Sequence, residues 1–207
     1  MEIDYRGANC VVIKSKSGII VTDPTGDIKA NEVSKENAVT LLTNDAFYPK
    51  DASFVIDMPG EYEHNNISIK GIPLQSAVDE DDKKSTTAYS ILIDGIRIVV
   101  TGHIKAPIGS DDDDTVEELG IVDVVIIPVV GGGTLDAHDS ATVVRQLSPK
   151  IVIPTHYADK NIKYEVPQEE LDLFLKEIGA SQEKISNLKI KSGSLPETLT
   201  IYEIARN

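Results

Sequence analysis

The chain has 207 residues, of which 41% are hydrophobic and 26% charged, with one cysteine and a formal net charge of −14 at pH 7. The lone cysteine excludes an internal disulfide framework, and the acidic balance argues against nucleic acid or an anionic membrane as partner, because both require clustered Lys and Arg. No apolar run approaches the roughly 20 residues that span a bilayer, and no secretory leader opens the chain, so we expect a soluble, cytoplasmic protein.

Short runs of β-branched residues, broken by Gly, Pro and Asp, dominate the first half of the chain. Such runs predict strands, and an Asp-Gly pair between two of them predicts a tight hairpin. That pair is Asp94-Gly95, and a second hairpin is expected around Ser15–Gly18. Two later runs are almost entirely Val and Ile, which is typical of strands buried on both faces. The predicted strands cover residues 9–14, 19–23, 38–43, 53–57, 66–72, 89–93, 97–101, 122–129, 150–154 and 198–204.

Three helices are predicted. A short one covers residues 115–119, and a longer one covers 136–147, between a Gly-rich turn and Ser148-Pro149. The third covers 167–178, because Pro167 suits a first helical turn, Gly179 suits a helix end, and the apolar residues follow helical spacing. Strands alternate with helices only in the second half. These elements predict an α/β (α+β) protein with a single domain over residues 1–207.

Four segments, taken in order, resemble the lactonase-like branch of the metallo-β-lactamase superfamily, a group of Zn-dependent hydrolases. They are GIIVTDP at 18–24, MPGEYE at 58–63, DVVIIPVVGGGTLD at 123–136 and KIVIPTHY at 150–157. The resemblance covers almost the whole chain up to Tyr157. It implies an αββα sandwich of two mixed β-sheets flanked by helices, with the active site at one sheet edge.

The metal ligands of that family are the main departure. The family carries a Thr/Ser-His-x-His-x-Asp-His run after its third strand, and this chain has TNDAFYP at residues 43–49. The resemblance places Asn44 and Ala46 at the first two His, Tyr48 at the Asp and Pro49 at the next His. It also places His103 at the position of a bridging Asp, and only His156 keeps its ligand identity. The resemblance therefore implies that the dinuclear site is absent.

Two functional hypotheses follow from this ligand loss. The first is a non-hydrolytic binding or assembly protein with no metal cofactor, whose partner is a small anionic metabolite, another protein or a second copy of the chain. The second is a hydrolase with a rebuilt single-metal site, in which His103 and His156 hold Zn or Mn. Asp45 and Asp136 are the candidate additional ligands of that site.

Overall fold

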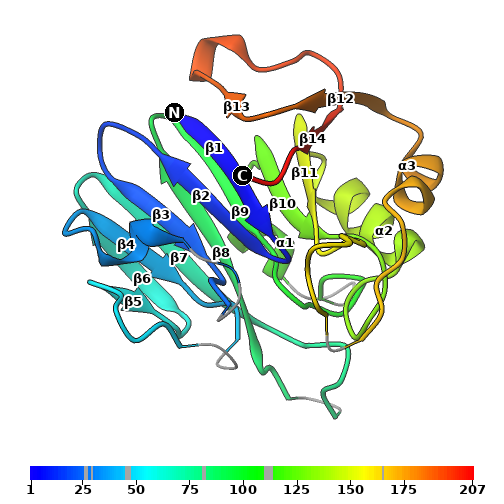
Figure 1. Ribbon diagram of the computed structural model, residues 1–207, viewed down its shortest axis with the longest axis horizontal. Helices are drawn as coiled ribbons and strands as arrows, with labels where there is room; N and C mark the ends of the chain where they lie inside the picture. The colour runs from blue at the N-terminus through cyan, green and yellow to red at the C-terminus, as the bar shows by residue number, and fades with distance from the viewer. Residues whose placement is uncertain (26–27, 29, 45–47, 81–82, 110–113, 165) are drawn as a thin grey trace.

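The computed structural model describes residues 1–25, 28, 30–44, 48–80, 83–109, 114–164 and 166–207, which form two β-sheets (Figure 1). Sheet A contains, in spatial order, β13 (Leu188–Lys189), β1 (Glu2–Gly7), β2 (Cys10–Lys14), β3 (Ile19–Thr22), β4 (Ala38–Leu41) and β5 (Val55–Ile56). Sheet B contains, in spatial order, β12 (Ser181–Ile185), β14 (Thr200–Ile204), β11 (Ile151–Thr155), β10 (Val124–Pro128), β9 (Ile96–Val100), β8 (Thr86–Ile93), β7 (Ile67–Leu74) and β6 (Gly60–His64).

Both sheets are mixed, as predicted. In sheet A the strands from β13 to β3 are antiparallel and those from β3 to β5 are parallel. In sheet B the strands from β6 to β9 are antiparallel, whereas β9, β10, β11, β14 and β12 are parallel. The two Val/Ile-rich runs are neighbours, since β10 pairs with β11 and every residue of both is buried. This confirms the prediction that both runs are buried strands.

The main core fills the space between the sheets, where Ile13 and Val39 of sheet A and Ile91 and Ile126 of sheet B belong to one cluster. A second cluster lies between sheet B and the helices α1 (Thr115–Leu119), α2 (Ala137–Leu147) and α3 (Asp172–Ile178). The outer face of sheet A is covered by the 3₁₀ helix η1 (Asn31–Ser34) and by loop residues. The predicted metallo-β-lactamase-type sandwich is therefore confirmed, with its α-helices on sheet B.

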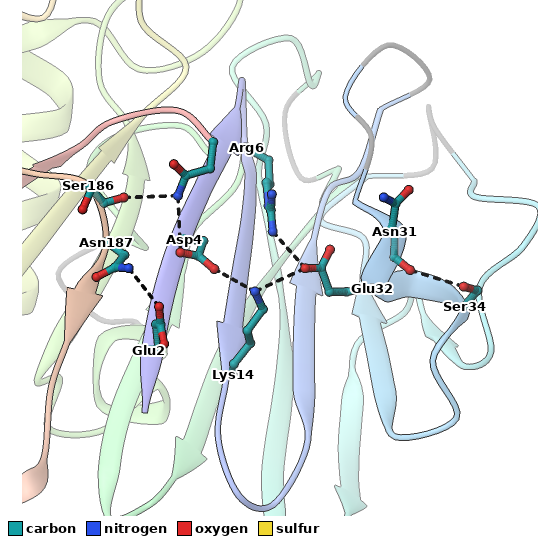
Figure 2. A network of polar contacts seen from close by, with 10 residues as sticks. Glu2, Asp4, Arg6, Lys14, Asn31, Glu32, Ser34, Ser186 and Asn187 are labelled. Carbon is teal, nitrogen blue, oxygen red and sulfur yellow. Dashed lines mark hydrogen bonds and ion pairs between the residues drawn. The ribbon is translucent and has the colours of Figure 1, made fainter.

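The outer face of sheet A carries a network of alternating charges (Figure 2). Nζ of Lys14 lies 2.9 Å from Oδ2 of Asp4 and 3.3 Å from Oε1 of Glu32. Arg6 also binds Glu32, at 2.8 Å. Glu32 and Asp4 are buried, so these contacts tie η1 to β1 and β2.

Several boundaries differ from the prediction. Helix α3 begins at Asp172 and not at residue 167, because the backbone around Glu169 bonds to the loops of Val130 and Ala158. Strands β1, β6, β12 and β13 were not predicted. No helix among the described residues is both long and apolar enough to cross a membrane.

Candidate functional site

A small cavity lies where several strands of both sheets end. Asp23 follows β3, Asn44 lies beyond β4, His103 lies beyond β9 and His156 follows β11. The turn between β1 and β2 closes another side. The cavity volume is about 60 Å³, which is room for only a few water-sized groups. Its lining consists of Ala8, Asn9, Asp23, Thr25, Leu42, Asn44, His103 and His156.

Asn9 holds His103 in a defined hydrogen-bonding state. The hydroxyl of Thr155 donates to Oδ1 of Asn9 at 3.0 Å, which fixes the orientation of the amide. Nδ2 of Asn9 lies 2.8 Å from Nε2 of His103. An amide nitrogen can only donate, so Nε2 of His103 accepts, and the proton of the neutral ring is on Nδ1. The lone pair of Nε2 is therefore used by a protein group.

Gln168 orients His156 in a similar way but leaves a lone pair open. Nε2 of Gln168 donates to the carbonyl oxygen of Val166 at 2.8 Å, so its Oε1 is the acceptor at 3.0 Å from Nδ1 of His156. The proton of His156 is thus on Nδ1, and Nε2 carries a lone pair. That nitrogen has no hydrogen-bond partner among the residues that the structure describes. His156 thus contributes an acceptor that no described residue uses.

Both imidazoles are neutral at physiological pH. Burial, with a smaller contribution from His156, lowers the pKa of His103 to about 4. Burial also lowers the pKa of His156, against the opposing effect of its bond to Gln168. The two ring centroids are 4.9 Å apart in an edge-to-face arrangement. The histidine pair therefore contributes hydrogen-bonding atoms but no positive charge.

Asp23 is the acidic member of the cavity lining. Burial raises the pKa of Asp23 to about 6, although two hydrogen bonds from Thr43 act in the opposite direction. The backbone N–H of Thr43 donates to Oδ1 at 2.7 Å, and its hydroxyl donates to Oδ2 at 2.8 Å. Near neutral pH the group is mainly a carboxylate.

The structure brings together some of the predicted site residues and separates others. Asn44, His103 and His156 line the cavity, although they are far apart in sequence. Tyr48 is 60% exposed and Pro49 is half-buried, and neither is part of the lining. Asp136 is exposed and caps α2, since Oδ1 accepts the N–H of Asp139. Two predicted members, Asp45 and Ala46, are outside the described residues.

Sequence reasoning missed three residues that define the site. Asp23 lies in the segment GIIVTDP at residues 18–24. This segment predicts where a strand ends, but it does not indicate that the carboxyl group of Asp23 is buried. Asn9 was assigned to a strand, and Gln168 to a helix. Their roles depend on the distant partners Thr155 and His156, which no local pattern indicates.

The donor set does not fit a catalytic zinc or manganese ion. Such a site takes three protein ligands and keeps one position open. Within the described part of the chain, no three His, Cys, Asp or Glu side chains are grouped so that they could hold a metal ion. One of the two imidazoles also has its Nε2 bonded to the amide of Asn9.

The fold and the cavity at its strand ends are those of a metallo-β-lactamase-type protein. A family model described as "Beta-lactamase superfamily domain" matches residues 2–156. The chain therefore belongs to the metallo-β-lactamase superfamily. Comparison with functionally curated proteins finds no match.

Solved structures share the fold. A Thermotoga maritima protein named a "putative zn-dependent hydrolase of the metallo-beta-lactamase superfamily" is 24% identical, with a TM-score of 0.77 over 99% of this chain and 98% of that one. A Parabacteroides distasonis "putative metal-dependent hydrolase" is 18% identical, with a TM-score of 0.58 over 77% and 84%. The Bacillus subtilis metallo-β-lactamase fold protein YhfI is 10% identical, with a TM-score of 0.59 over 99% and 96%. At these identities the likeness is one of fold.

Proposed function

We propose that this chain is a non-hydrolytic member of its superfamily that acts as a binding or assembly protein. The observation that carries the proposal is the bond from the Asn9 amide to Nε2 of His103, which uses a lone pair that a metal would need. Together with the absence of a three-ligand group in the described residues, this leaves no support for a metal-bound hydroxide.

The charges of the cavity favour a different ligand from the small anionic metabolite expected from the sequence. The described lining contains no Lys or Arg, and its two histidines are neutral. Among the described lining residues, the one ionised group is the carboxylate of Asp23. An anion would therefore meet repulsion with no compensating charge. A neutral or cationic group fits the lining better.

The test is elemental analysis of untagged protein purified without chelator, in which we expect far less than one metal ion per chain. Added Zn²⁺ should change the melting temperature little, because only a ligand that binds the native state raises it by mass action. Asn9→Ala removes the amide from His103 and should increase the response to Zn²⁺. Near-stoichiometric zinc in the unmodified protein, lost in His103→Ala or His156→Ala, would overturn the proposal.

One observation favours the second candidate, a hydrolase with a single metal ion. Nδ1 of His156 donates to Gln168, and metal-binding histidines are commonly oriented through their second nitrogen in this way. Nε2 of His156 is therefore available as one ligand. The experiment above separates the two candidates, because the single-metal hydrolase requires bound metal in the protein as purified.

A further inference from the structure

Asp23 is a buried carboxylate that has no cationic partner among the residues that the structure describes. It is 9% exposed and lines the cavity, and its described partners are the N–H and hydroxyl of Thr43, which are neutral. The described residues that line the cavity with it include no Lys or Arg. Burying an unpaired negative charge is costly, so a cation that entered the cavity would be stabilised there.

His156 adds a second acceptor to the same cavity. Its Nε2 carries a lone pair that no described residue uses, and the Gln168 amide prevents the ring from presenting Nδ1 as an acceptor instead. Ala8 and Leu42 supply apolar surface beside these polar atoms. The described lining therefore combines one carboxylate and one neutral imidazole acceptor with a wall that is mostly apolar.

We propose that this cavity binds a small primary ammonium group, whose N–H bonds are donated to the carboxylate of Asp23 and to Nε2 of His156. This inference rests on the proposed absence of a metal ion, because a metal would take the same lone pair. A volume of about 60 Å³ admits the ammonium head and a short alkyl group.

Other cations match the lining less well. Ca²⁺ and Mg²⁺ take six or more oxygen ligands, including water, and an imidazole nitrogen is not among the ligands that they prefer. Zinc requires further protein ligands, and Nε2 of His103 is bonded to Asn9. A primary ammonium has three N–H donors and needs only acceptors. It therefore suits a site with one carboxylate and one imidazole nitrogen that no described residue occupies.

The test is titration of the metal-free protein with methylammonium chloride near neutral pH, with sodium chloride and tetramethylammonium chloride at equal ionic strength as controls. Methylammonium should raise the melting temperature in a saturable way, and the controls should not, because tetramethylammonium has no N–H to donate. Asp23→Asn should abolish the response, whereas Asp51→Asn, at an exposed position, should retain it.

A spectroscopic measurement on the unmodified protein covers the case in which Asp23→Asn fails to fold. The ¹⁵N resonance of His156 Nε2 should move on addition of methylammonium as this nitrogen becomes a hydrogen-bond acceptor. Nε2 of His103, which already accepts from Asn9, should change less. Butylammonium has the length of a lysine side chain and tests whether the cavity admits such a chain. If butylammonium binds at least as well as methylammonium, the ligand can be a lysine of a partner. If only methylammonium binds, the ligand is a free small amine.

The outcomes are distinct. Metal-free protein that shows no saturable response to either amine, or the same response to tetramethylammonium, overturns this inference and leaves the proposed function intact. Stoichiometric metal bound through His156 overturns both.

Discussion

Gly132 and the side chain of Gln168 are in such close contact that a β-carbon on residue 132 would lie 2.0 Å from Nε2 of Gln168. Gly132 also has a φ of +64°, a conformation that residues with a β-carbon rarely adopt. Because Gln168 orients His156, the Gly-rich turn before α2 contributes to the cavity through this contact. The turn thus helps to position His156 in the cavity.

The first prediction compares Gly132→Ala with Gly133→Ala. Both glycines have a positive φ, so both variants should lose about 1–2 kcal/mol of unfolding free energy from backbone strain. Nothing lies within 4 Å of a β-carbon at Gly133, so only Gly132→Ala should displace Gln168 and shift the NMR resonances of His156. Equal shifts in the two variants would contradict the contact.

The second prediction concerns the pH dependence of stability. The pKa of His103 is about 4 in the fold and 6.5 in the unfolded chain, so its contribution to stability is lost as the pH falls from 6.5 towards 4. The pKa of Asp23 is about 6 in the fold and 3.8 when unfolded, so its protonation favours the fold as the pH falls through 6. The two contributions oppose each other.

Single variants should reveal these opposing contributions. Relative to the unmodified protein, His103→Gln should gain stability as the pH falls from about 6.5 to 4, by up to about 1.4 kcal/mol per pH unit. Asp23→Asn should show the opposite trend below pH 6, because the favourable protonation is lost. Urea unfolding at a series of pH values measures both. Differences of the same sign in the two variants would refute the assignment.

The third prediction tests the charge network on sheet A. Glu32→Gln leaves Lys14 and Arg6 without their shared carboxylate and should cost about 1–3 kcal/mol of unfolding free energy. Glu36→Gln, at an exposed position four residues away, should change it by less than about 0.5 kcal/mol. Burial raises the pKa of Glu32, but a backbone hydrogen bond, Arg6 and Lys14 together hold it below its usual value. The stabilisation should therefore be present above pH 4.5 and diminish as the pH falls.

The fourth prediction separates capping from metal binding at Asp136. Asp136→Ala should destabilise the protein by about 1 kcal/mol, because the N–H of Asp139 loses its acceptor at the start of α2. Asp136→Ser should retain most of the stability, since serine is also a good N-cap. Neither variant should alter the response to Zn²⁺. A reduced response in Asp136→Ala would support the single-metal alternative.

The sequence predicts those elements whose cause is local. Asp94 and Gly95 both have positive φ, as a two-residue hairpin turn requires, and the helix over residues 115–119 is observed with the predicted bounds. The predicted start of α3 failed because hydrogen bonds of Glu169 to distant loops override the local helical pattern. β12, with the sequence SQEKI, is exposed along most of its length and lacks the apolar alternation that identifies a strand.

The cavity could be predicted in location but not in composition. The resemblance indicated that Asn44, His103 and His156 lie at one sheet edge, and all three line the cavity. The bonds that give the cavity its chemistry join residues far apart in the chain, such as Asn9 to Thr155 and Asp23 to Thr43. Such partners depend on how the loops pack, which a single sequence does not encode in any local pattern.

The position of β1 in sheet A has a consequence for folding during synthesis. One neighbour of β1 is β13, and Arg206 forms a further bridge to Tyr5, so among the described residues this side of β1 pairs with residues that are made much later. Until then β1 presents an open edge, and exposed strand edges can pair with other chains. We therefore expect a chain without residues 188–206, which also lacks β14 of sheet B, to aggregate, whereas these residues shield the edge of β1 in the folded structure.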